Sequence, residues 1–141
     1  MQKVTKICIC ILLFSCKSTA IRTYNKQMKE VFIYDFKVRY FRKLLKEGFN
    51  NSESIKSILK HDISGFGEMI LTMDDLNLID SLVNIDNQKM TADSISRSKL
   101  HREWDHGKRV FDYALLKYNS KWLDSLARAS YRLSAKSLRR Q

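Results

Sequence analysis

The sequence predicts an all-α domain of four to five helices, and three observations support this fold class. The chain of 141 residues has no proline and four glycines, so it lacks the turn residues that many short strands need. Its apolar residues recur every three or four positions, which is the period of a helix. Its length is that of one domain, and it suffices to bury a core.

The first segment, residues 1–15, has the features of a signal peptide. Lys3 and Lys6 precede an apolar run, residues 7–14, that is too short to cross a bilayer, which takes about 20 residues. A small residue, Ser15, then stands directly before Cys16, as in the lipobox of bacterial lipoproteins. We expect a lipid on Cys16 and a polar tether over residues 16–30. The alternative is an ordinary signal peptide whose cysteine is accidental.

The cysteines set a further expectation for the mature chain. Cys8 and Cys10 lie inside the apolar run and would leave with it, and Cys16 would be acylated. The mature chain would then have no disulfide and would depend on its core alone. Several acyl chains on one cysteine would anchor the protein stably. No acidic cluster follows Cys16, so we expect the domain to face the periplasm from either the inner or the outer membrane.

The helical domain is expected over residues 31–141. Its first helix covers residues 31–49, and Gly48 marks its expected end. Four residues give this helix an apolar face, with Tyr40 and Leu44 beside them: Tyr34, Val38, Phe41 and Leu45. A short second helix should follow, because Asn50 and Glu53 have the spacing of a capping box.

A loop at residues 64–67, which contains two glycines, separates the second helix from a third. Asp74 and Asp75 favour the N-terminus of the third helix, because acidic residues complement the helix dipole there. Leu76, Ile79 and Val83 then continue with helical spacing. From residue 86 to residue 102 the chain is mostly polar, which indicates a solvent-exposed helix or a mobile connection.

The last segment, after Gly107, carries the most regular apolar pattern. Its apolar residues recur at intervals of three and four, and Asn119-Ser120 could divide it into two helices. The members of this stripe are Phe111, Leu115, Tyr118, Trp122, Leu126, Ala129 and Leu133. We expect the stripe, with Trp122 in it, to belong to the core.

Charge divides the mature chain into three blocks. Residues 17–60 hold 11 basic and 4 acidic residues, residues 61–106 hold 4 and 9, and residues 107–141 hold 9 and 2. The basic blocks could lie on anionic lipid headgroups, attract an acidic protein, or simply keep helix faces in water. No nucleic acid partner is expected, because an exported lipoprotein rarely meets one.

No residue pattern indicates an enzyme, a metal site or a cofactor. The run His101-x-Glu103-x-x-His106 contains ligand-type residues, but two histidines five positions apart point in different directions from a helix. The serine of residues 61–64 (HDIS) lacks a setting such as G-x-S-x-G, and these residues suit a helix end. We therefore expect no catalytic residue, no metal and no cofactor.

Two stretches carry a family resemblance. They are Tyr40–Arg42 with Gly48–Ser52, Ile55, Leu59 and Asp62, and Gly107–Phe111 with Tyr118–Ala127. Together, over most of residues 35–130, they resemble small envelope proteins similar to the amidase immunity proteins of type VI secretion. Members of that family are all-α, act in the periplasm and often form homodimers. They are not enzymes; they block the active-site groove of a cell-wall amidase delivered by another cell.

The resemblance implies a periplasm-facing lipoprotein that binds and inhibits a cell-wall amidase effector, and a homodimer is possible. Members often carry cysteines in the first helix and near residues 113–115. Tyr40, Leu44 and Ala114 occupy those regions here, so a family disulfide would be missing. The alternative function is that of a structural or accessory lipoprotein of an envelope complex.

We place the contact with the partner in residues 61–106, at Ser64, Phe66, Trp104 and Asp105. An acidic segment suits entry into a basic groove. A tryptophan in a polar segment, such as Trp104, is a candidate interface anchor. Trp104 could equally pack onto the last helix as a cap.

Overall fold

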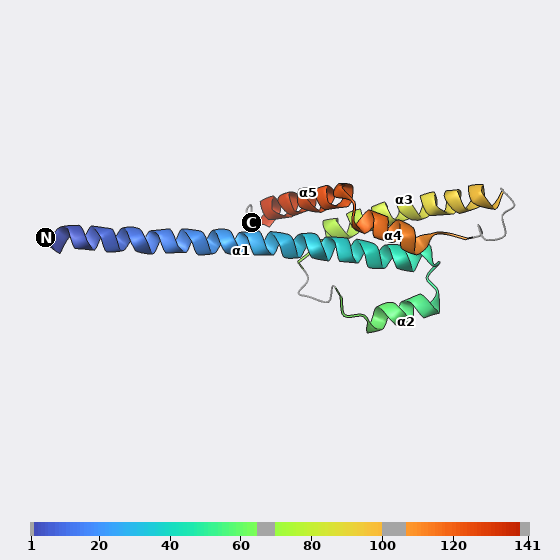
Figure 1. Cartoon of the computed structure of the whole chain (residues 1–141), viewed down its shortest axis with the longest axis horizontal. Helices are drawn as coiled ribbons and strands as arrows, with labels where there is room; N and C mark the ends of the chain where they lie inside the picture. Colours follow the sequence, from blue (N-terminus) through green and yellow to red (C-terminus); the bar gives the residue numbers. More distant parts are fainter. Residues whose placement is uncertain (1, 65–69, 100–106, 139–141) are drawn as a thin grey trace. The chain divides into compact units, whose positions relative to one another are not determined.

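The structure, a computed structural model, describes residues 2–64, 70–99 and 107–138, and side chains within these ranges from residue 25 to residue 135. The described residues form five helices and no strand, which confirms the all-α class. The helices are α1 (Gln2–Gly48), α2 (Glu53–His61), α3 (Met73–Ser98), α4 (Val110–Tyr118) and α5 (Lys121–Leu138) (Figure 1). The chain divides into two units, Met1–Val31 and Phe32–Gln141.

The first unit lies within α1. This helix carries the residues that the sequence assigns to the signal peptide, to Cys16 and to the tether. Among the described residues, no helix combines the length and the hydropathy that crossing a membrane requires. Cleavage after Ser15 and lipidation of Cys16 stay predictions.

The second unit has a hydrophobic core to which every helix except α2 contributes. Within this unit, Figure 1 draws α3, α4 and α5 along one side of α1 and α2 on the other. The buried apolar residues are Phe32, Ile33, Phe36, Tyr40, Leu44 and Leu45 of α1, Leu71, Ile79, Val83 and Met90 of α3 and its approach, Val110 and Ala114 of α4, and Leu123 and Ala127 of α5. α1 thus supplies the aromatic side chains, and the last two helices supply smaller ones.

Only part of the apolar stripe of the last segment is buried: Tyr118, Leu126 and Ala129 are partly buried, and the expectation that the stripe belongs to the core is wrong for the other members, Trp122 among them. Phe111, Leu115, Trp122 and Leu133 are all about half exposed or more. The reason is the space already filled by the aromatic residues of α1. Because dense interiors leave little room for a second layer of aromatic side chains, α4 and α5 bury Val110, Ala114, Leu123 and Ala127, while Tyr113 and Tyr131 pack against the core from its edge.

The start of α3 and the break between α4 and α5 lie where the sequence predicts them. At the start of α3, Thr72 Oγ1 accepts the N–H of Asp75 at 3.2 Å, and the Asp75 carboxylate accepts the N–H of Thr72 at 2.9 Å. Asn119-Ser120 separates α4 from α5, and Ser120 Oγ accepts the N–H of Leu123 at 3.1 Å. α3 continues to Ser98, so the polar stretch after residue 86 is helical up to that point.

The capping box expected to begin at Asn50 is wrong. Asn50 and Asn51 have left-handed backbone angles, with φ of 53° and 57°, which asparagine tolerates better than most residues. The N–H of Asn51 bonds to the carbonyl of Lys46 at 2.8 Å, and that of Asn50 to the carbonyl of Glu47 at 3.0 Å. This is the Schellman pattern, so the asparagines end α1. Ser52, the residue before α2, makes no side-chain cap bond.

Gly48 lies in the last turn of α1 and marks a close contact between helices. A methyl group on Gly48 would lie 2.5 Å from Cγ1 of Val110 in α4 and 3.4 Å from Cε of Met90 in α3. The first distance is shorter than carbon atoms can approach. Glycine at this position therefore lets α4 pack directly on the backbone of α1.

Gly48→Ala should lower the thermal midpoint of unfolding. Overpacking against Val110 costs about 1–3 kcal/mol, which exceeds the gain of about 1 kcal/mol that alanine brings to a helix. Circular dichroism melts measure the effect. Val110→Ala in the same chain should restore part of the loss, since it removes the clashing methyl groups. A Gly48→Ala protein that melts at or above the parent temperature would show that this contact does not limit packing.

Candidate partner-binding surface

α2 and the turn after it form an exposed amphipathic element. Ile55, Ile58 and Leu59 share one face of α2 by their spacing, yet no residue of the helix is buried. Ile58 is 63% exposed, and Ile63, just beyond the helix, is 83% exposed. We define these residues, 53–64, as the α2 element. It presents apolar side chains to solvent without contributing to the core.

Arg42 of α1 holds the C-terminal end of the α2 element. Its guanidinium donates hydrogen bonds to the backbone carbonyls of Leu59, Asp62 and Ser64, the last two at 3.0 Å. It also pairs with the Asp62 carboxylate. The last carbonyls of a helix lack partners within the helix and favour a positive charge. A single side chain therefore fixes the end of α2 to α1.

Asp62 closes the turn that carries Ser64. Its Oδ1 accepts the N–H of Ser64 at 3.0 Å. The hydrogen bonds from Ser64, more than the charge of Arg42, lower the pKa of Asp62. The ring of His61 bonds to the carbonyl of Ser57 at 2.8 Å. Residues 61–64 thus take part in ending α2.

Arg42→Lys should loosen the α2 element without unfolding the domain. Lysine cannot reach several carbonyls at once as the planar guanidinium does, and α2 has no buried residue to hold it otherwise. Hydrogen exchange of the α2 amides should quicken, while the thermal midpoint changes little. Arg39→Lys is the matched control, because Arg39 pairs with Asp35 in α1 alone. Equal exchange of α2 in both variants would show that Arg42 does not hold the element.

The structure describes one of the four residues predicted to contact the partner. Ser64 is exposed, at the end of the α2 element. Phe66, Trp104 and Asp105 lie outside the described residues, and so does the side chain of Cys16. The ligand-type residues between positions 101 and 106 lie outside them too. The roles of these residues stay predictions.

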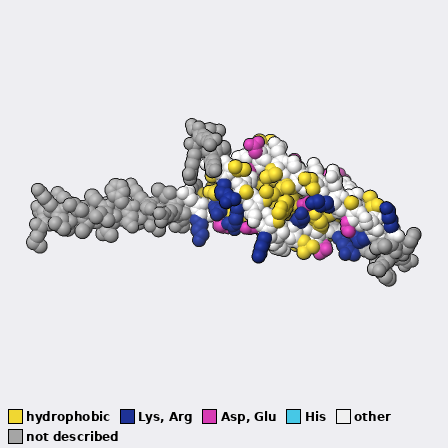
Figure 2. Space-filling model, turned by 90° about the horizontal axis from the view of Figure 1, so that it is seen from above, with side chains coloured by type: hydrophobic (Ala, Val, Ile, Leu, Met, Phe, Trp, Pro, Cys, Tyr) yellow, Lys and Arg dark blue, Asp and Glu magenta, His cyan; other side chains and the backbone are white. Residues whose placement is uncertain are grey.

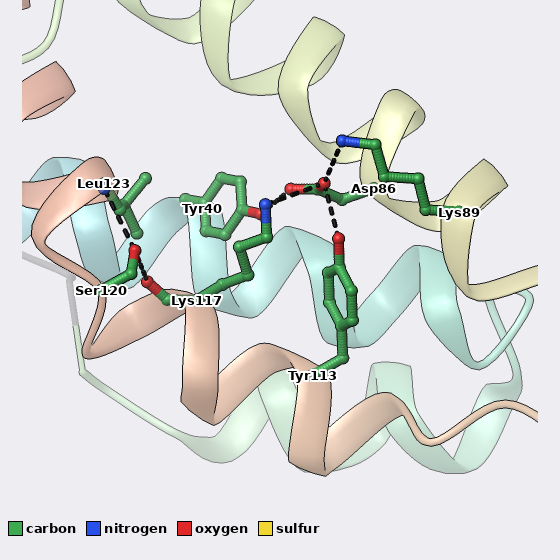
Figure 3. Close-up of polar contacts among 7 residues, drawn as sticks. All are labelled: Tyr40, Asp86, Lys89, Tyr113, Lys117, Ser120 and Leu123. Carbon is green, nitrogen blue, oxygen red and sulfur yellow. Dashed lines mark hydrogen bonds and ion pairs between the residues drawn. The ribbon is translucent and has the colours of Figure 1, made fainter. Parts of the chain in front are cut away.

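A buried carboxylate, Asp86 of α3, was missed by the sequence reasoning. The hydroxyl of Tyr40 in α1 donates to its Oδ2, and the hydroxyl of Tyr113 in α4 donates to its Oδ1 at 2.8 Å (Figure 3). Nζ of Lys117 lies 3.1 Å and Nζ of Lys89 3.5 Å from the same Oδ1. Asp86 is 2% exposed. Three helices therefore meet at one charge, which we call the Asp86 cluster.

The Asp86 cluster is locked in one protonation state at neutral pH. Burial alone would raise the pKa of Asp86, but hydrogen bonds from Tyr40, Tyr113 and Lys117 outweigh it and lower the pKa. Burial, and then the bond to Asp86, raise the pKa of both tyrosines well above their usual range. Asp86 is thus ionised while the tyrosines stay protonated. Neither kind of group is poised for proton transfer near neutral pH, so we interpret the cluster as structural.

A second buried carboxylate, Asp75, joins α3 to α5. Ser130 donates its hydroxyl to Asp75 Oδ1, and Ser134 and Thr72 donate to Oδ2 at 3.0 and 2.7 Å. Burial would raise the pKa of Asp75, but these hydrogen bonds lower it. The sequence indicated its position in the first turn of α3 but not its bonds to another helix.

Comparisons of the chain with family models, with curated proteins and with solved structures find no match. Within the described ranges, no three His, Cys, Asp or Glu side chains lie close enough together to hold a metal ion.

The free energy of unfolding should fall at both ends of the pH scale. Asp75 and Asp86 have a lower pKa folded than the value of about 3.9 expected unfolded, so their contribution is complete above that pH and is lost as pH falls through the folded pKa. Tyr40 and Tyr113 have a raised pKa, so their contribution is complete below about pH 10 and is lost as pH rises beyond it. Urea titrations across pH measure both limits.

Tyr40→Phe tests the Asp86 cluster directly. Removing one donor from a buried carboxylate should cost about 1–3 kcal/mol of unfolding free energy at neutral pH. Tyr34→Phe, at a position of the same helix that is half exposed, is the matched control and should change stability by less than about 0.5 kcal/mol. Equal stability of the two variants in urea would contradict the role given to Asp86.

Proposed function

We propose that this chain is a periplasm-facing lipoprotein, held by a lipid on Cys16, that binds and inhibits a cell-wall amidase. The α2 element is the observation that carries the binding role. It exposes Ile58 and Ile63, contributes nothing to the core, and is fixed to α1 by Arg42. An apolar element that is already ordered loses little conformational entropy when a partner covers it.

The resemblance to immunity proteins of type VI secretion supplies the class of partner. An amidase that cuts peptidoglycan works in the periplasm, so its inhibitor must be exported. A lipid anchor would keep the inhibitor in the cell that it protects. A protein that blocks an active-site groove one to one needs a rigid surface rather than catalytic groups. Asp75 and Asp86, the buried carboxylates that bond across helices, support such rigidity.

A structural or accessory lipoprotein of an envelope complex is the second candidate. The basic residues of segment 107–141 favour it, because they would attract anionic lipid or an acidic membrane partner. Salt separates the two candidates. Lipid contacts made by exposed basic residues weaken strongly as salt rises, whereas an apolar contact through the α2 element does not.

A pull-down tests the proposal first. The full chain, tagged at its C-terminus, is mixed with an extract of envelope and secreted proteins at physiological salt, and mass spectrometry identifies what stays bound. One stoichiometric cell-wall amidase, whose release of peptidoglycan fragments stops when the chain is added, is the expected result. Membrane-assembly proteins alone, or lipid alone, would overturn the inhibitor proposal and support the accessory role.

Ile63→Glu should weaken binding of the captured amidase at least about tenfold, because a charge would replace a central apolar contact. Titration calorimetry gives the affinity. Ile95→Glu is the matched control: Ile95 is also more than half exposed, but it lies in α3. A similar loss in both variants, or none in either, would place the contact away from the α2 element.

A further inference from the structure

α5 carries an apolar flank that the core leaves uncovered. Trp122, Leu126, Ala129 and Leu133 recur every three or four positions, so they line one flank of the helix. Trp122 is 48% exposed and Leu133 is 69% exposed, while Leu126 and Ala129 are partly buried. The inward side of α5 is formed by other residues. This flank therefore leaves the large side chains of Trp122 and Leu133 outside the core of the domain.

The core holds the tryptophan of this flank in place. Nζ of Lys117 lies 4.6 Å from the centre of the Trp122 ring, in the position of a cation–π contact. The same ammonium lies 3.1 Å from Oδ1 of the buried Asp86. The indole is thus oriented through the Asp86 cluster, although about half of its surface is open. An exposed side chain held in this way is prepared to contact another surface.

Basic residues run beside the apolar flank. Lys121 and Arg132 are exposed on the outer side of α5, and Arg128 pairs with Asp124 at 2.7 Å. In the sequence, residues 121–141 hold six basic residues and one acidic residue, Asp124. Figure 2 shows Lys and Arg side chains among hydrophobic ones on the face that it presents. Trp and Leu beside Lys and Arg on one helix are typical of helices that lie in a membrane interface.

We propose that α5 docks on an anionic lipid surface. Trp122 and Leu133 enter the headgroup region, and Lys121 and Arg132 contact lipid phosphates. The positive charge of the segment makes an anionic surface the complementary one, and a strip along one helix suits a flat surface better than a pocket. The inference does not rest on amidase binding, because the α2 element contributes no residue to this surface.

The test measures the fluorescence of Trp122 alone. The chain has two tryptophans, so Trp104→Phe leaves Trp122 as the single reporter. The full chain is reconstituted in vesicles of phosphatidylcholine, or of phosphatidylcholine mixed with phosphatidylglycerol, each containing brominated lipid as a quencher. In the mixed vesicles we expect emission at shorter wavelength and strong quenching. Both effects should largely disappear at about 1 M salt, where the screening length is about 3 Å.

Charge variants identify the surface. Lys121→Glu combined with Arg132→Glu should lower the docked fraction at least about tenfold, since each basic residue near the headgroups adds to binding. Lys46→Glu combined with Lys60→Glu is the matched control, because these exposed lysines lie on α1 and α2. The control should keep the parent quenching. Circular dichroism shows whether each protein stays helical.

Three results would overturn the proposal. Emission and quenching of Trp122 that are equal in both vesicle types would show that the flank does not meet anionic lipid. A shift to shorter wavelength without lipid, growing with protein concentration, would show that a second copy of the chain covers it instead. Equal quenching in the Lys121–Arg132 variant and in its control would also contradict docking through α5.

Discussion

Asp86 is a charge placed inside an apolar core, and the arrangement of α1, α3 and α4 depends on it. A buried carboxylate without partners would be strongly destabilising, so the chain must bring Tyr40, Tyr113 and Lys117 to it at the same time. Apolar packing alone tolerates small slides of one helix along another. Three directed contacts to one carboxylate would be broken by such a slide. Asp86 therefore sets the register of three helices that are far apart in sequence.

The second buried carboxylate that bonds across helices, Asp75, positions α5 in the same way, whereas α2 has no such contact to a buried carboxylate among the described residues. Asp75 bonds to Ser130 and Ser134, so α5 is positioned by directed polar contacts as α4 is. α2 has no buried residue and is held by Arg42. The molecule thus separates a rigid centre from two surfaces that have no part in stabilising it, the α2 element and the flank of α5. Surfaces that do not stabilise the fold are available to bind a partner or a lipid surface.

Helical spacing predicted where helices form, but it could not tell which flank would face the core. The residues from Trp122 to Leu133 follow the helical period as well as any core stripe, yet the aromatic residues of α1 take the space that they would need. The polar stretch that begins at Asp86 indicates an exposed segment, yet Asp86 itself continues the spacing of Ile79 and Val83 and is buried. The bond of Arg42 to carbonyls about 20 residues away has no signature in local sequence, because only the tertiary arrangement brings them together.

The small residues on the inner side of α5 have a consequence for how the domain opens. Besides Leu123, the buried residues of α5 are the small Ala127 and Ser130, so releasing this helix exposes less apolar surface than releasing α1, with Phe32, Phe36, Tyr40 and Leu44, would. Its polar bonds to Asp75 can be replaced by bonds to water. Fluctuations that detach α5 as a unit should therefore be more frequent than global unfolding, which gives the domain a hierarchy of local stabilities with its C-terminal helix at the lower end.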